Sequence, residues 1–243
     1  MLDLATGHHV HTAFAAGRDA VTVLVAAAEQ SGLRELTLAD EAGPDTPWLA
    51  AYLATIQRAR QRTDVVLRAG IEVEAVTYDG WLAFPRDLTG LEVVSVAIGA
   101  LPMPAGLADP ATVRAMVDAG ALRPGDVVEM LVSVTARALD RMVRYAPTRL
   151  ARPLDFLSRM GVPDHEIGDA ALAELSDACL RTGTLVEVSE RHRTPSPHMA
   201  ARFAAAGVRL VPASDARQAR ELGRWRYLDQ VRAELAAAVQ PTA

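Results

Sequence analysis

The chain has 243 residues, half of them hydrophobic, with a formal net charge of −5 and a sequence pI near 5.7. This length allows one large α/β domain or two small ones, and the acidic balance argues against general nucleic-acid binding, which needs a basic face. Every basic residue is Arg, so a Schiff-base lysine and a Walker-type phosphate loop are excluded.

Neither export nor membrane insertion is indicated. The first residues contain no basic-then-apolar stretch of the signal-peptide type, and no apolar run reaches the roughly 18 residues of a membrane span. The single cysteine, Cys179, allows no internal disulfide and lies in an apolar-periodic segment, where we expect it to pack in the core. We therefore expect a cytoplasmic protein without membrane contact.

Short strand-like runs alternate with longer helical patterns through most of the chain. In chain order the sequence predicts a strand at 8–12, a helix at 19–31, a strand at 33–40, a helix at 47–62, strands at 64–76 and 91–99, a helix at 123–143, a strand at 148–154, a helix at 169–183, a strand at 184–190, a helix at 196–207, a strand at 208–216 and a closing helical segment at 218–239. Gly32, Gly183 and Gly207 each end a predicted helix before a strand, as αβ loops do. No linker or repeat interrupts this series, so it predicts a single-domain α/β fold over residues 1–243, a TIM-like (βα) barrel.

Polar residues gather at the carboxyl ends of the predicted strands, which form the catalytic rim of a (βα) barrel. They are His9, His11, Asp40, Glu41, Glu72, Arg152, Ser189, Glu190, Asp215 and Arg217. In a strand, side chains two positions apart point to the same face, so His9 and His11 are able to converge on one metal ion. His8 is expected on the opposite face and is not expected to be a ligand.

Several dispersed motifs resemble the polymerase and histidinol phosphatase (PHP) family across nearly the whole chain. They are "HVHTAFAAGRDAV", "LTLADEAG", "RAGIEVE", "TRLARPLDF", "VEVSE" and "VPASDAR". The resemblance implies a distorted seven-stranded (βα) barrel. It also implies hydrolysis of phosphate esters by a cluster of up to three metal ions at the strand ends.

Carried over from the family, His9, His11, Glu72 and Asp215 match the ligands of the first metal ion. Two imidazoles and two carboxylates suit Zn²⁺, Mn²⁺ or Fe²⁺, with ligand distances of about 2.0–2.3 Å. The alternative is a metal-free remnant of such a site, held together by hydrogen bonds.

The other metal ligands of the family are mostly replaced. Where the family has histidine, this chain has Glu41, Gly99, Arg152 and Arg217. Arginine is permanently protonated and brings a fixed positive charge instead of a metal ligand. Arg152 takes a second-metal position beside Glu72. Because the family's third metal is shared between the positions of Glu41 and Arg217, we predict a direct ion pair there, in which removing one partner leaves a buried unpaired charge and costs more stability than removing both.

These residues support two hypotheses of different kinds. The first is a mononuclear metal-dependent hydrolase or lyase acting on a small phosphate- or carboxylate-bearing anion. Arg152 and Arg217 would bind the anion and stabilise developing charge, and Asp40 or Glu41 would be the general base. Arg18 and Arg193 are further candidates for binding the anion with their bidentate forks. The second is a catalytically inactive barrel that binds an anionic ligand or a partner protein. The oligomeric state stays open.

Overall fold

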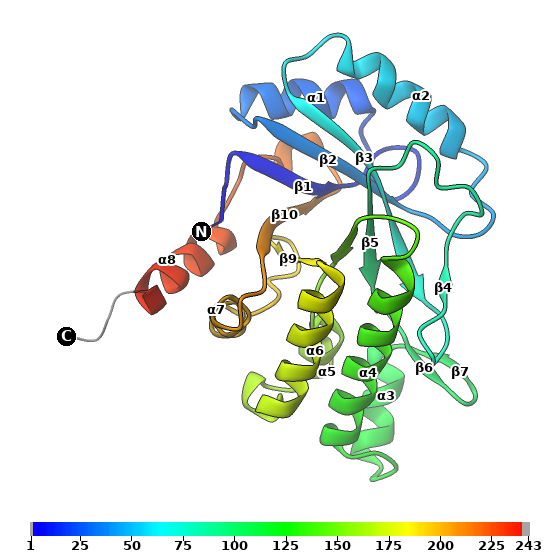
Figure 1. Ribbon diagram of the computed structural model, residues 1–243, viewed down its shortest axis with the longest axis vertical. Coiled ribbons are helices and arrows are strands. Elements are labelled where there is room, and N and C mark those ends of the chain that lie inside the picture. The colour runs from blue at the N-terminus through cyan, green and yellow to red at the C-terminus, as the bar shows by residue number, and fades with distance from the viewer. Residues whose placement is uncertain (1, 240–243) are drawn as a thin grey trace.

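The computed structural model describes residues 2–239, and a closed barrel of parallel strands forms its centre (Figure 1). The barrel strands are β1 (Thr6–Val10), β2 (Glu35–Glu41), β3 (Val66–Ala75), β5 (Val93–Ala97), β8 (Thr148–Leu150), β9 (Leu185–Ser189) and β10 (Leu210–Ala216). Each pairs in parallel with the next, and β10 pairs with β1, which closes the ring. The short β4 (Leu82–Ala83) adds to β3 in the antiparallel direction. The predicted seven-stranded (βα) barrel is confirmed.

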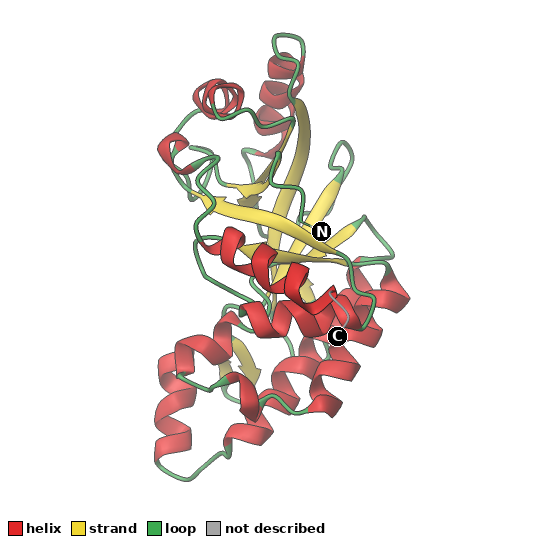
Figure 2. Cartoon of the chain, turned by 90° about the vertical axis from the view of Figure 1, so that its left-hand side faces the viewer, coloured by secondary structure: helices red, strands yellow, loops and turns green. Residues whose placement is uncertain are grey.

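Helices surround the strands, as Figure 2 shows. They are α1 (Val21–Gln30), α2 (Leu49–Arg60), α3 (Pro110–Asp118), α4 (Pro124–Met142), α5 (Asp155–Met160), α6 (Asp169–Thr182), α7 (Pro197–Ala205) and α8 (Tyr227–Val239). Leu36 and Leu38 of β2 pack outward into one apolar cluster with Tyr52 and Ile56 of α2. Cys179 is buried in a second cluster, as expected. Within residues 2–239, no helix has both the length and the hydropathy needed to cross a membrane.

Side chains at alternate strand positions, such as Thr37 between Leu36 and Leu38, face the barrel interior, and several of them are polar. Thr37, Ser95, Arg149 and Glu187 are all buried. The interior of such barrels is usually filled by branched aliphatic side chains. Here a layer of hydrogen-bonding and charged groups lies beneath the carboxyl ends of the strands, and one of them, Glu187, contacts His9.

The strand β4 and the helix α5 lie outside the predicted elements, and three further regions depart from them. The predicted closing helical segment at 218–239 divides into a 3₁₀ helix at Ala219–Glu221 and α8, with Gly223 at φ +68° between them. The Glu190 carboxylate accepts hydrogen bonds from the backbone N–H groups of Tyr227 and Leu228, so this rim residue caps α8.

The second departure lies between β5 and α4. Residues there form a hairpin of β6 (Leu101–Met103) and β7 (Gly106–Ala108), followed by α3. Asp109 caps α3 by accepting from the Thr112 N–H at 2.7 Å, and Pro110 occupies its first turn. Third, the predicted strand at 148–154 ends at Leu150, since Arg152 and Leu154 both have positive φ.

Candidate metal centre

An irregularity in β1 places the histidines. Gly7 and Val10, three residues apart, pair with Leu36 and Leu38, which are two residues apart. The extra residue on β1 is accommodated at His9, whose φ is +58°. The bulge lets consecutive side chains reach the interior, so the expectation that His8 faces the other way is wrong. His8 Nδ1 lies 3.0 Å from Thr37 Oγ1 and takes no part in the metal-ligand group described next.

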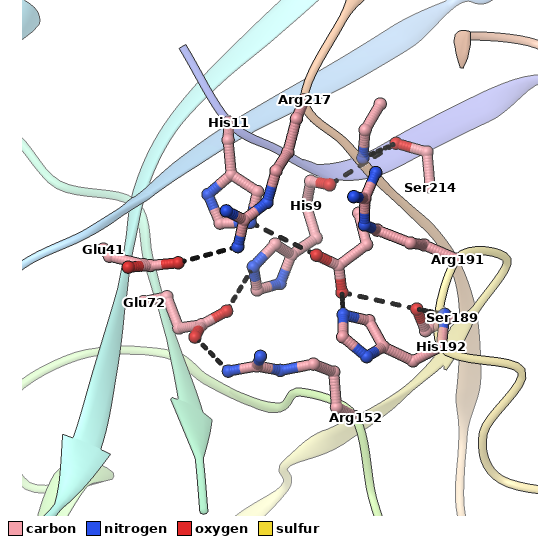
Figure 3. A network of polar contacts seen from close by, with 12 residues as sticks. His9, His11, Glu41, Glu72, Arg152, Ser189, Arg191, His192, Ser214 and Arg217 are labelled. Carbon is pink, nitrogen blue, oxygen red and sulfur yellow. Dashed lines mark hydrogen bonds and ion pairs between the residues drawn. The ribbon is translucent and has the colours of Figure 1, made fainter. Parts of the chain in front are cut away.

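Three buried side chains offer a possible metal site. One potential ligand atom from each of His9, His11 and Glu72 lies within 4.8 Å of the other two. His9 Nε2 and Glu72 Oε2 form an ion-pair contact of 2.6 Å without hydrogen-bond geometry, and His11 Nδ1 makes no hydrogen bond. Figure 3 shows these groups converging at the carboxyl end of the barrel. Buried polar atoms without partners are costly, and imidazole and carboxylate donors are those that divalent transition metals take, so the residues fit such an ion.

The far side of His9 is held by a residue that the sequence patterns did not single out. His9 Nδ1 lies 2.7 Å from Glu187 Oε2, and the Ser95 hydroxyl donates to Glu187 Oε1 at 2.8 Å. Burial alone would lower the pKa of His9, but the charges of Glu187, Asp215 and Glu72 outweigh it and raise that pKa well above its ordinary value. The imidazole therefore lies in a strongly negative environment, which favours a cation.

Asp215 lies beside this group, at the end of β10. Its Oδ1 is 3.2 Å from His11 Nε2, and its Oδ2 accepts from Ser189 Oγ at 3.3 Å. Burial alone would raise the pKa of Asp215, but the charge of His9 and hydrogen bonds from His11 and His192 hold it well below its usual value. Asp215 is outside the three-residue group, and its role as a fourth ligand stays a prediction.

Arg152 fills the place predicted for it next to Glu72. Its guanidinium pairs with Glu72 Oε1, and the same Nη2 lies 3.3 Å from Glu74 Oε1. Glu74 in turn accepts from the Gly99 N–H at 2.6 Å. A Cβ atom built on Gly99 would lie 2.8 Å from Glu74 Oε1, so this carboxylate occupies the space of a side chain at position 99.

The predicted ion pair between Glu41 and Arg217 is confirmed. Arg217 Nη2 lies 3.0 Å from Glu41 Oε1 (Figure 3). The expectation that it is a buried pair is wrong, because the side chains are 34% and 50% exposed. The pair stands at the outer edge of the rim, where water solvates both charges and an unpaired partner is not buried.

The remaining predicted residues lie in different surroundings. Asp40 is fully buried and accepts hydrogen bonds from the Thr12 N–H at 2.8 Å and the Thr12 hydroxyl at 2.5 Å, which fixes the turn after β1.

The side chains of Arg18 and Arg193 are exposed. The Arg18 backbone N–H donates to the Arg217 carbonyl at 2.8 Å. Neither side chain belongs to the polar network of Figure 3, and their predicted contact with an anion stays a prediction.

His192 and Asp155 complete the network and were not among the predicted site residues. His192 Nδ1 is 3.4 Å from Asp155 Oδ1, and its Nε2 is 3.5 Å from Asp215 Oδ2. Burial alone would lower the pKa of His192, but these two carboxylates raise it to about 9. Both residues lie outside the strands, so strand periodicity gives no signal for them. The signal for Glu187 is a charged residue between two valines in a predicted strand.

No family profile and no curated protein matches this sequence. Several solved structures align with most of this chain at low scores. The HpcH/HpaI aldolase of Desulfitobacterium hafniense DCB-2 aligns with 98% of this chain and 93% of its own, at 8% identity and a TM-score of 0.41. A candidate metal-dependent phosphoesterase of Bifidobacterium adolescentis ATCC 15703 aligns over 97% of both chains, at 16% identity and a TM-score of 0.37. D-Psicose 3-epimerase of Clostridium cellulolyticum H10 aligns over 96% of both, at 10% identity and a TM-score of 0.38. At these scores the likenesses carry no argument about activity.

Proposed function

We propose that this protein is a metal-dependent hydrolase or lyase of the PHP phosphoesterase type that uses one divalent transition metal ion and acts on a small anionic substrate. The observation that carries the proposal is the convergence of three buried side chains, His9, His11 and Glu72, each with a buried polar atom that lies outside any hydrogen bond. A buried polar atom without a hydrogen bond costs about 1–3 kcal/mol. A shared cation would satisfy such atoms on all three side chains.

The donor set favours Zn²⁺, Mn²⁺ or Fe²⁺, with Asp215 as the proposed fourth ligand. When bound, such an ion supplies a Lewis acid and lowers the pKa of a coordinated water. The contacts of the surrounding residues hold these donor side chains in place. Glu72 divides its two oxygens between neighbours, since Oε1 pairs with Arg152 and Oε2 points toward His9.

Fixed charges take the places where family members hold further ions. Arg152 compensates Glu72 and Glu74, and Arg217 compensates Glu41. This arrangement supports one metal ion rather than three. Glu41 is the better candidate for the general base, because it is half-exposed at the rim, whereas both Asp40 oxygens are engaged by Thr12.

We propose that the substrate anion is held at the rim by arginine forks. Arg152 and Arg217 are already paired with carboxylates, so an anion has to compete with Glu74 and Glu41 for them. Arg18 and Arg193 have exposed side chains and are the proposed first contacts for a phosphate or carboxylate group.

A second candidate is a catalytically inactive barrel that binds an anionic ligand or a partner protein. One observation favours it: Arg152 balances the charge of Glu72 without any metal ion. In that case the three unpaired atoms are a remnant of a lost site, and the protein binds its ligand through the rim arginines alone.

Metal analysis separates the two candidates. The wild-type protein is purified without chelators, loaded in turn with Zn²⁺, Mn²⁺ and anaerobic Fe²⁺, and assayed against a panel of phosphate monoesters and diesters. We expect about one equivalent of metal. The double variant His9→Ala/His11→Ala should bind none, and His165→Ala, which changes an exposed histidine, should match the wild type. A metal-free wild type would establish the second candidate, and two or more ions would contradict the single-metal site.

A further inference from the structure

A buried carboxylate contacts His9 on the side opposite the candidate ligand atoms. Glu187 Oε2 lies 2.7 Å from His9 Nδ1, while Ser95 donates to the other oxygen at 2.8 Å. Glu187 and His9 have no exposed surface. Glu187 therefore cannot touch a substrate, and any influence it has on the site passes through His9.

This contact determines which nitrogen of His9 is available. The Glu187 carboxylate accepts a hydrogen bond, so the proton of a neutral His9 lies on Nδ1. The lone pair is then on Nε2, which is the atom that faces Glu72 and has no hydrogen-bond partner. Without a carboxylate at Nδ1, the proton is free to occupy either nitrogen, and only one of the two tautomers offers Nε2 to a cation.

Glu187 is itself held firmly. It lies within β9, where Val211 of β10 is its register partner, and the adjacent Ser95 lies on β5. Arg149 of β8, which is 5% exposed, supplies positive charge beside it. A hydrogen bond from β5 and a positive charge from β8 thus act on one carboxylate of β9.

The backbone of His9 adds to the need for such support. Its φ of +58° is unusual for a non-glycine residue and costs on the order of 1–3 kcal/mol. The bulge turns the side chain into the interior, but a bulge alone does not fix the rotation of the ring. The hydrogen bond to Glu187 supplies that constraint.

We propose that Glu187 is the positioning residue of the metal site, which selects the Nδ1–H tautomer of His9 and aims Nε2 at the ion. This inference rests on the proposed function, since it assumes that the site binds metal. Partners of this kind behind ligating histidines typically contribute about 10- to 100-fold in metal affinity.

The test is a set of dissociation constants for Zn²⁺ and Co²⁺, measured by calorimetry and by the visible absorption of bound Co²⁺. Glu187→Met removes the acceptor and should weaken binding about 10- to 100-fold with the stoichiometry unchanged. Glu187→Gln keeps an amide oxygen that accepts from Nδ1, so it should retain affinity between those of Glu187→Met and the wild type. The matched control is Thr37→Val, a fully buried polar residue of the same interior that contacts His8 instead of His9, and its affinity should equal that of the wild type.

The results distinguish failure of the proposed function from failure of the positioning role of Glu187. If the wild type binds no metal, the proposed function fails and the inference fails with it. If the wild type binds metal and Glu187→Met binds it equally well, the inference alone is overturned. If Glu187→Met does not fold, Glu187→Gln and Ser95→Ala decide in its place, and wild-type affinity with an unchanged Co²⁺ spectrum in both variants overturns the positioning role.

Discussion

Arg152 and Arg217 each pair with a carboxylate at the carboxyl end of the barrel, and their surroundings differ. Arg152 lies in the centre, with 14% of its side chain exposed, beside a Glu72 side chain that is 2% exposed. Arg217 lies at the rim, where it and Glu41 are a third to a half exposed. Both form ion pairs with carboxylates, yet water is excluded from one pair and surrounds the other.

This difference separates two consequences of pairing a guanidinium with a carboxylate. In the centre, Arg152 compensates a Glu72 carboxylate that is shielded from water, so losing the arginine carries a desolvation cost. At the rim, Arg217 pairs with a carboxylate that water also solvates, so the pair contributes little to stability. Substitutions in the central pair are therefore expected to cost more stability than substitutions in the rim pair.

The largest expected effect follows from breaking the central pair. Arg152→Met leaves the buried Glu72 with His9 as its remaining cationic partner, so the free energy of unfolding should fall by about 3 kcal/mol, the low end of the range for breaking a buried pair. Urea denaturation of metal-free protein measures it. The double variant Arg152→Met/Glu72→Gln should recover part of the loss, because the buried carboxylate is removed together with the arginine. Equal losses in the single and double variants would show that Glu72 is not charged or not dependent on Arg152.

Metal binding should raise the free energy of unfolding, and this increase should not depend on the rim pair of Glu41 and Arg217. At a free Zn²⁺ concentration of 100 times the dissociation constant, the free energy of unfolding should rise by about 2.7 kcal/mol. Thermal melts with and without Zn²⁺ measure the increase. It should vanish in His11→Ala and persist in full in Arg217→Gln. A metal effect that disappears with Arg217 would place the ion at the rim instead.

Acid should destabilise the metal-free protein because Asp215, a buried carboxylate of the site, becomes protonated. Asp215 has a folded-state pKa well below its usual value of about 3.9. A carboxyl group with a depressed pKa contributes stability that is fully present above its unfolded pKa and is lost as the pH falls toward its folded pKa. The free energy of unfolding should therefore decline from about pH 5 downward. Asp215→Asn should flatten this decline, whereas the rim variant Glu41→Gln should keep it. A decline as steep in Asp215→Asn as in the wild type would assign the effect to other carboxylates.

The smallest effect is expected for the rim pair. Arg217→Gln and Glu41→Gln should each change the free energy of unfolding by no more than about 1 kcal/mol. Their coupling in a double-mutant cycle should be about 0.2–1 kcal/mol and should shrink as salt is added. A coupling several times larger and insensitive to salt would mean that the pair behaves as a buried one.

The sequence predicted the barrel because its strands and helices alternate with clear helix ends, such as the one at Gly183, which is in the left-handed conformation. It also brought His9, His11 and Glu72 to one end of the barrel, since parallel strands end at a common rim. Regular alternation could not predict the bulge at His9, which depends on pairing with both neighbouring strands. For the same reason it placed His8 on the wrong face.

The supporting residues of the site were harder to predict. Glu187 is charged and fully buried, which runs against the usual preference of charged residues for the surface. Its contacts follow only from the closure of the barrel, because Ser95 on β5 and His9 on β1 reach it across the interior from strands that do not pair with β9. His192 lies in the loop after β9, where no periodicity constrains the side chain. The burial of the Glu41–Arg217 pair was overestimated because a sequence does not show how far a rim projects into water.

The contact between Gly99 and Glu74 links the charge balance of the site to a residue that carries no charge. A Cβ atom at position 99 would lie 2.8 Å from Glu74 Oε1, so any larger residue there requires the Glu74 side chain to move. Glu74 shares the guanidinium of Arg152 with Glu72. A substitution at position 99 therefore changes how the charge of Arg152 is divided between the two carboxylates.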